Sequence, residues 1–343
     1  SLDLGFDQAV AAMARLTSLS AWGLALLLLL TALLSLSIGS TSVPVWGGLL
    51  DWVGGRDTAG AIIIGEIRLP RTLLALVVGA ALGLSGAALQ GLLRNPLADP
   101  GLTGASQGAA LGAAAVFYFG LFPWAGEAAP ALAGLIGAGV ALTLMLVLAG
   151  SSRPAMVILA GLAISTVTGA ALAIVLNFAP NPYALQERGV WLLGSGRERG
   201  LNHLLWVRPP CVQGAALIWR QRALLSALSL GEQVAASLGL SLRGGSRQVV
   251  LGAALLVGSS VSVAGSIGFV GLLVPHLVRP WVGHRPDRLL WPSAFAGATL
   301  VCLADICVRL LPPGRELKLG VLTSLLGAPL FIWLVWKDRK RWL

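Results

Sequence analysis

Long apolar runs fill most of the chain, and short polar segments separate them. A helix that crosses a membrane needs about 20 mostly apolar residues, and most of these runs have about that length. The pattern therefore predicts an all-α polytopic membrane protein with about ten transmembrane helices in a single domain, residues 1–343. The predicted spans are residues 20–39, 70–93, 103–122, 128–150, 155–178, 203–224, 247–265, 267–282, 289–311 and 318–336.

Composition supports this class of protein. Hydrophobic residues make up 56% of the chain, charged residues only 11%, and the mean hydropathy is +0.84. A soluble domain carries about 25% charged residues, so an ordinary soluble enzyme and a disordered chain are both excluded. The net charge of +10 fits basic loops against an anionic membrane face better than nucleic-acid binding. An even number of spans, with Arg and Lys enriched on one side, predicts that both termini are cytoplasmic.

Two patterns of small residues indicate how the helices are related. The segment Ser85–Leu97 resembles Ala264–Leu277, and a shift of five spans would invert the second copy, as in many transporters. Chance similarity between Gly- and Leu-rich segments explains this match equally well. Two rows of small residues, spaced by four, favour close helix packing within one subunit over a dimer interface. These rows are Gly104, Gly108 and Gly112, and Gly161, Ser165 and Gly169.

Charges inside the predicted spans are few. Asp305 is the one carboxylate well inside a span, and Arg309 follows one turn later on the same helical face. A paired charge costs less in a membrane than a lone one. The pair is either a proton or ion relay or a structural ion pair that connects this helix to its neighbours, and we favour the structural role. The scarcity of embedded acids argues against an ion-coupled secondary transporter that works without an ATPase, which remains the alternative function.

The sequence offers no set of residues that would bind a metal or cofactor or catalyse a reaction. Its three histidines, His203, His276 and His284, lie in separate segments, so His276 is interpreted as a polar anchor. The spacing of Cys302 and Cys307 fits no metal motif. No Gly-x-x-x-x-Gly-Lys-Ser/Thr phosphate loop is present. We therefore predict a chain that is not an enzyme and holds no cofactor, so that any ATP must bind to another chain.

The segment 228–240, between the sixth and seventh spans, predicts a short amphipathic helix on the cytoplasmic face. Ser229 and Glu232 have the spacing of a capping box, and Gly239 is placed to end the helix. Leu230, Val234 and Leu238 form one apolar stripe. Such a helix either lies on the bilayer or fits a groove on a partner, and its sequence does not decide between them. Prolines at 96 and 100 predict a rigid turn beside Arg94 on the same side.

Six motifs in order resemble the permease subunits of ATP-binding-cassette (ABC) importers for cobalamin, ferric siderophores and haem, the type II importers. The resemblance covers about residues 60–337. The motifs are Arg68-Leu69-Pro70-Arg71, Asn95-Pro96-Leu97-Ala98-Asp99-Pro100, Gly231-Glu232 through Leu238-Gly239, Gly268 through Pro275-His276, Ala304-Asp305 and Gly320 through Pro329. The chain departs from the family pattern at Lys318, where proline is usual, and at 207–211.

The resemblance implies a homodimer in the bacterial inner membrane, two cytoplasmic ATPase subunits that bind ATP and Mg, and a soluble periplasmic binding protein. It implies that the amphipathic helix couples the chain to the ATPase. The coupling residues would be Ser229, Leu230, Gly231, Glu232, Val234, Ala235, Leu238 and Gly239. Arg56, Arg315 and Lys318 are candidates for docking the binding protein. Haem is the favoured substrate, with ferric siderophores and cobalamin as alternatives.

Overall fold

The computed structural model describes residues 22–39, 41–96, 98–150, 154–178, 194, 200–283, 285–311 and 317–342. Every regular element in this part of the chain is helical. The first helix is Trp22–Ser37. It is followed by α2 (Val45–Val53), α3 (Ala59–Ile62), the π-helix η1 (Ile63–Arg68), α4 (Leu69–Leu93), η2 (Pro100–Thr103), α5 (Ala105–Phe119), η3 (Pro123–Ala128), α6 (Ala129–Ala149), α7 (Pro154–Asn177), α9 (Leu201–Arg220), α10 (Arg222–Leu228), α11 (Glu232–Ser237), α12 (Leu242–Ala264), α13 (Val270–Val278), η4 (Arg279–Val282), α14 (Pro286–Arg309) and α15 (Leu319–Trp342).

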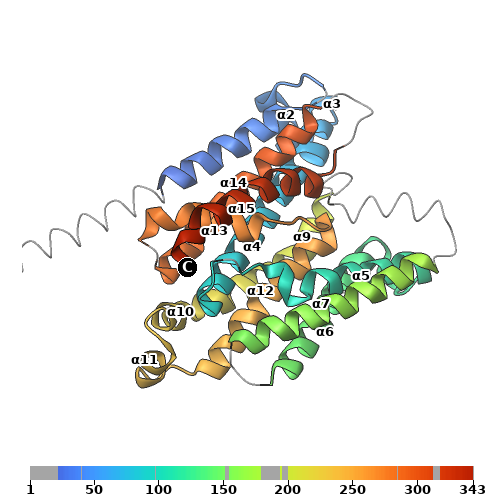
Figure 1. Cartoon of the computed structure of the whole chain (residues 1–343). Coiled ribbons are helices and arrows are strands. Elements are labelled where there is room, and N and C mark those ends of the chain that lie inside the picture. The colour runs from blue at the N-terminus through green and yellow to red at the C-terminus, as the bar shows by residue number, and fades with distance from the viewer. Residues whose placement is uncertain are drawn as a thin grey trace, which may run out of the picture.

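Helix α4 lies at the centre of the bundle and is buried along most of its length (Figure 1). It crosses α14 where glycines face each other. A Cβ atom on Gly79 would lie 2.3 Å from the carbonyl oxygen of Gly297, so the two backbones are in direct contact. Large side chains at this crossing would separate the helices, which explains the small residues there.

A second group of helices, α5, α6, α7, α9 and α12, packs on the other side of α4 (Figure 1). A Cβ on Gly108 of α5 would lie 2.5 Å from the Gly137 carbonyl oxygen of α6, and one on Gly112 would lie 2.0 Å from that of Ala133. The first row of small residues therefore packs within the subunit, as predicted. In the second row, a Cβ on Gly169 would meet no atom within 4 Å.

Each of the ten predicted spans corresponds to a helix in the described part of the chain. Several boundaries differ by three to six residues: α12 begins at Leu242 rather than at 247, and α15 ends at Trp342 rather than at 336. The sixth helix runs through Pro209 and Pro210 but ends at Arg220, because the chain turns at Gln221 before α10 begins. The eighth starts at Val270, because the preceding segment is irregular and Phe269 adopts a left-handed conformation with φ of 67°. Helices α2 and α3 were not predicted, because both are far shorter than a membrane span.

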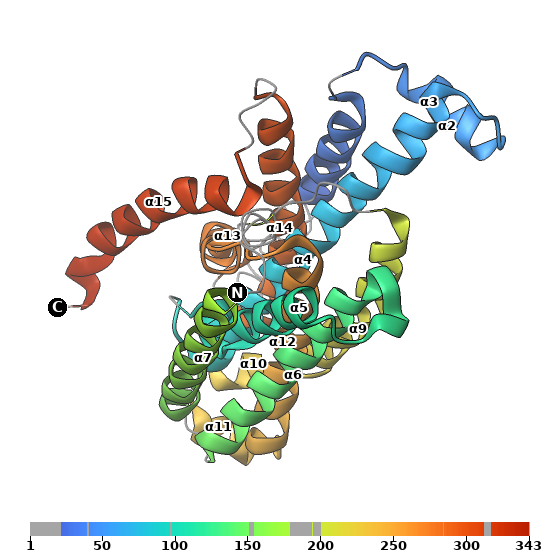
Figure 2. The same cartoon turned by 90° about the vertical axis from the view of Figure 1, so that its right-hand side faces the viewer.

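The bundle has two ends that matter for function. The α2–α3 end carries α2, α3, the start of α4 and the end of α14, whereas the α10–α11 end carries α10, α11, the end of α4 and the starts of α12 and α14 (Figure 1). Helix α15 extends away from the other helices, as Figure 2 shows.

Candidate functional site: the two ends of helix α4

The predicted amphipathic segment, residues 228–240, contains one short helix, α11, which follows α10 after a sharp turn at residues 229–231. Gly231 is the N-cap of α11 and has φ of 112°, a conformation that favours glycine. The capping box is absent, because the Ser229 hydroxyl donates to the carbonyl oxygen of Ser226 at 2.6 Å instead of reaching α11. Gly239, with φ of 75°, ends the helix as predicted, and the Leu240 N–H donates to the Ala235 carbonyl oxygen at 3.3 Å.

The predicted apolar stripe is present and faces outward. Leu230, Val234 and Leu238 are 68%, 40% and 62% exposed, whereas Ala235 is fully buried against the rest of the bundle. Val234 lies within α11, Leu230 lies in the turn before it, and Leu238 is its C-cap, and a group of exposed apolar side chains such as this is typical of a binding surface. We call Leu230, Val234 and Leu238 the α11 patch.

An ion pair connects α11 to the end of α4. The Arg94 Nη2 lies 3.4 Å from Glu232 Oε1, and both side chains are about half exposed. Arg94 itself adopts a left-handed conformation with φ of 49° and is the C-cap of α4. The chain therefore turns sharply at this residue, which places its side chain beside the start of α11.

A buried amide connects α4 to the short helix α13. The Gln90 side chain donates from Nε2 to the Leu272 carbonyl oxygen at 3.1 Å, and its Oε1 accepts from Arg279 Nη2 at 2.6 Å. Gln90 is only 2% exposed. One turn earlier, a Cβ on Gly86 would lie 1.9 Å from the Gly271 carbonyl oxygen. The two similar segments identified in the sequence therefore pack directly against each other.

The proline-containing turn after α4 is held by local hydrogen bonds. The Asn95 N–H donates to the Gln90 carbonyl oxygen at 3.2 Å, and Asp99 Oδ1 accepts from the Gly101 N–H at 2.6 Å. Burial raises the pKa of the Asp99 carboxyl, and the hydrogen bond from Gly101 opposes this rise. Pro100 packs against Gly271, where a Cβ would lie 2.4 Å from its ring. Hydrogen bonds therefore hold the described residues of this turn, and Pro100 contacts α13.

A small apolar pocket lies between this turn, α13 and α15. His276 is among its lining residues, and Pro275 is buried within α13 next to it. Among the described residues, no three His, Cys, Asp or Glu side chains gather in a way that could hold a metal ion. The pocket is lined by Pro96, Phe269, Leu272, Leu273, His276, Gly327 and Phe331.

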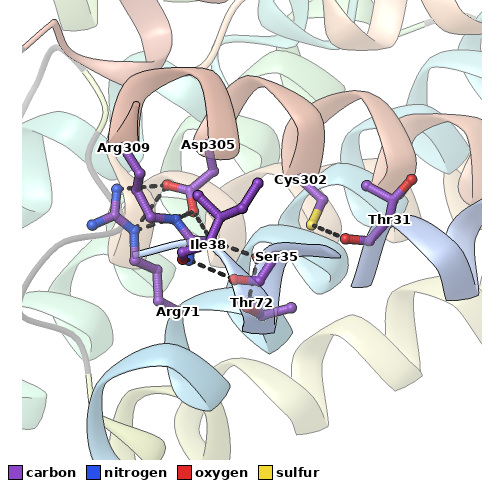
Figure 3. Close-up of polar contacts among 8 residues, drawn as sticks. All are labelled: Thr31, Ser35, Ile38, Arg71, Thr72, Cys302, Asp305 and Arg309. Carbon is purple, nitrogen blue, oxygen red and sulfur yellow. Dashed lines mark hydrogen bonds and ion pairs between the residues drawn. The ribbon is translucent and has the colours of Figure 1, made fainter. Parts of the chain in front are cut away.

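At the α2–α3 end, Asp305 is held by two arginines. Arg71 of α4 donates to Asp305 Oδ1 from Nε at 2.9 Å and from Nη2 at 2.8 Å, and Arg309 Nη2 donates to Oδ2 at 2.6 Å (Figure 3). The predicted pair of Asp305 and Arg309 is thus present. The spacing of residues in the sequence did not predict that Arg71 also pairs with Asp305, because the two are 234 positions apart. Both carboxylate oxygens accept guanidinium hydrogen bonds, which supports a structural role rather than a proton relay.

Two arginines, Arg309 and Arg68, hold the end of the first helix. Arg309 Nη1 donates to the carbonyl oxygens of Ser35 and Ile38 at 2.8 and 3.2 Å (Figure 3). Arg68 is buried and donates from Nη1 to the Leu36 carbonyl oxygen at 2.9 Å. The last carbonyl groups of a helix lack partners within the helix, and here guanidinium groups supply them. We call Arg68, Arg71, Asp305 and Arg309 the arginine–aspartate cluster.

Two of the three docking candidates, Arg56 and Lys318, lie in the described part of the chain. Arg56 follows α2, is largely exposed, and pairs with Asp51 at 3.1 Å. Lys318 directly precedes α15. Arg315 lies outside the described residues.

Known proteins resemble this chain over nearly its whole length. The sequence model of the FecCD transport family matches residues 27–337. The chain is 38% identical over 326 residues to the hemin transport system permease protein HmuU of Yersinia pestis, covering 93% of this chain and 95% of that protein. It is 39% identical over 326 residues to the vitamin B12 import system permease protein BtuC of Salmonella paratyphi A, covering 92% and 94%. A solved metal-chelate-type ABC transporter in an inward-facing conformation matches with a TM-score of 0.81 at 32% identity, covering 94% of this chain and 99% of that one.

Proposed function

The chain belongs to the FecCD transport family of multi-pass membrane permeases, and we propose that it forms the pathway of an ABC importer for a large iron-containing or corrinoid compound. Haem is the first candidate, because a hemin permease is among the similar proteins. Cobalamin is a further candidate, because a vitamin B12 permease is about equally similar. In this proposal, substrate moves from the periplasm to the cytoplasm, and both termini are cytoplasmic. The chain itself supplies the pathway and no catalytic group.

The observation that carries the proposal is the α11 patch. Its three exposed apolar side chains lie before, within and at the end of α11, with Glu232 at the start of the helix, and such a surface suits a groove on a separate ATPase subunit. The sequence has no phosphate-binding loop, so ATP and Mg would bind to that partner. Coupling then runs through Ser229, Leu230, Gly231, Glu232, Val234, Ala235, Leu238 and Gly239.

The contacts of α11 suggest how ATP would drive the permease. If the two ATPase subunits approach each other on binding ATP, each α11 would move with its ATPase as a rigid body. Arg94 would carry this displacement to α4, and Gln90 would carry it to α13. The free energy of ATP acts only to the extent that the ATPase contacts differ between the inward- and outward-open states.

A second copy of the chain fits the faces of α7 and α15. Both helices expose large apolar side chains, including Val167 and Ile174 on α7 and Leu325 and Ile332 on α15. Helix α15 makes few contacts within the subunit and extends away from it (Figure 2). We propose that these faces meet in a homodimer with the pathway at its two-fold axis.

At the α2–α3 end, a soluble binding protein would deliver the substrate. Arg56, Arg315 and Lys318 are the proposed contacts for acidic residues on that protein, and their charge would guide its approach. The alternative, an ion-coupled carrier that works without an ATPase, is disfavoured because the carboxylate of Asp305 is already bound by two arginines.

The test is ATP hydrolysis by the complex purified from native membranes through a tag on this chain. The expected result is a co-purifying ATPase whose rate rises with one binding protein loaded with haem, a ferric siderophore or cobalamin. The loaded compound that raises the rate identifies the substrate. A chain that purifies without ATPase and still transports in vesicles along an ion gradient would contradict the proposal.

A further inference from the structure

The lateral face of α9 carries a stripe of exposed apolar side chains that ends in tryptophan. Leu205, Val212 and Trp219 are spaced by seven residues, which places them on one face of the helix. They are 61%, 61% and 38% exposed. In a multi-pass membrane protein, such a stripe faces the acyl chains of lipids, and tryptophan is enriched where those chains give way to headgroups.

Trp219 is one member of an aromatic row that joins two helices. Its ring packs against Trp291 of α14 with the centroids 5.5 Å apart, and Trp291 packs against Phe295 at 6.3 Å. Trp291 remains 44% exposed. The row therefore forms an open aromatic surface between the last turn of α9 and the first turns of α14.

One arginine stacks on this surface, and two more lie close to its tryptophans in the sequence. The guanidinium carbon of Arg222 lies 4.5 Å from the centroid of the Trp219 ring. Arg220 follows Trp219 directly, and Arg288 precedes Trp291 by three residues, which places it on the same face of α14. All three side chains are exposed. We call Trp219, Trp291, Arg220, Arg222 and Arg288 the Trp–Arg patch.

The patch carries an excess of positive charge. Among the described residues, no carboxylate lies within ion-pair distance of these three guanidinium groups. The nearest acid in the sequence, Asp287, is engaged by Arg285 at 2.9 Å. Guanidinium groups bind phosphate oxygens through paired hydrogen bonds, and basic pockets between membrane helices bind anionic headgroups. Stacking on Trp219 also orders the Arg222 side chain before any ligand arrives.

We propose that the Trp–Arg patch binds an anionic phospholipid of the adjacent leaflet. The arginines hold its phosphate, the two tryptophans contact the glycerol region, and the acyl chains lie along the α9 stripe. A phospholipid would cover the exposed apolar stripe of α9 and also neutralise the arginines, whereas a soluble phosphate would only neutralise the arginines. The site lies beside α10, which leads into α11, so a bound lipid would contact the segment that connects α9 to the α11 patch.

The test measures lipid binding to the full-length chain in detergent by native mass spectrometry. The probes are phosphatidylglycerol and phosphatidylcholine with identical acyl chains. The wild-type chain is expected to bind its first phosphatidylglycerol about tenfold more tightly, a difference of about 1.4 kcal/mol in binding free energy. Replacing Arg220→Gln, Arg222→Gln and Arg288→Gln together should remove this preference.

A matched control changes two exposed arginines of α12, Arg243→Gln and Arg247→Gln, and should keep the preference. Equal binding of both lipids by the wild-type chain, or equal loss in the control, would overturn the proposal. Displacement of the lipid by soluble glycerol phosphate would show a phosphate site without a lipid and also contradicts it. A triple variant that keeps its lipid preference but loses a co-purifying ATPase would assign the patch to that protein instead.

Discussion

The two ends of α4 are built from similar residue types but in opposite ways. At the α2–α3 end, Arg71 meets a carboxylate that is buried and hydrogen-bonded on both oxygens. At the α10–α11 end, Arg94 meets Glu232 through a single contact at 3.4 Å, with both side chains about half exposed. Buried pairs with complete hydrogen bonding fix one geometry, whereas exposed pairs contribute little and reform easily.

The two ends of α4 therefore differ in how firmly they are held. The arginine–aspartate cluster joins three segments, the first helix, α4 and α14, so a displacement there would break many bonds at once. Helix α11 is joined to α4 by one surface pair and exposes its apolar side chains. A segment with few internal contacts and an exposed binding surface is suited to follow a moving partner.

The largest expected effect comes from removing the shared carboxylate. Asp305→Asn leaves three arginines close together without a counter-charge, and breaking a buried pair costs about 3–5 kcal/mol. We expect the free energy of unfolding in detergent, or the yield of folded protein, to fall accordingly. The matched control is Asp51→Asn, which removes the exposed pair with Arg56 and should cost less than about 1 kcal/mol. Equal losses in the two variants would show that the cluster does not fix this end.

An intermediate effect is expected at Gln90, which is buried like Asp305 but is uncharged. Gln90→Ala removes the side-chain hydrogen bonds to α13 and to the Arg279 guanidinium, at a cost of about 1–3 kcal/mol. Because α13 is then joined less firmly to α4, the amount of substrate moved per ATP should also fall. The control is Gln248→Ala, whose partner Gln221 is partly exposed. A variant that loses stability but keeps its transport per ATP would limit Gln90 to a structural role.

A smaller effect on stability is expected at the exposed pair. Glu232→Arg should change the free energy of unfolding by less than about 1 kcal/mol, because water already screens both side chains. It should nevertheless reduce association with the ATPase, since it reverses the charge at the start of α11. The exchange of both residues, Arg94→Glu with Glu232→Arg, restores the internal pair. If the exchange also restores uptake, the link to α4 matters; if only the ATPase contact matters, uptake stays low.

The sequence predicted the helices better than the contacts between them. Each span was visible because about 20 apolar residues are a strong local signal. The second partner of Asp305 was not, because Arg71 and Asp305 are 234 residues apart and one sequence shows no such pairing. The spacing of Ser229 and Glu232 predicted a cap that is absent, because Gly231 turns the chain between them. Local sequence patterns thus predict where helices form and end. Ion pairs between distant residues and sharp turns cannot be predicted from them, because they depend on how the backbone folds.

The smallest effect on stability is expected from the α11 patch itself. Leu230→Ser together with Leu238→Ser should change the free energy of unfolding by no more than about 0.5 kcal/mol, because both side chains are mostly exposed in the free chain. The same variant should lose the co-purifying ATPase, since an apolar contact would become polar. Ala235→Leu on the same helix supplies the contrast. Its side chain is fully buried, so added bulk should cost about 1–3 kcal/mol by forcing α11 from the bundle. If the double serine variant unfolds as readily as Ala235→Leu, the patch stabilises this chain and is not a surface for a partner.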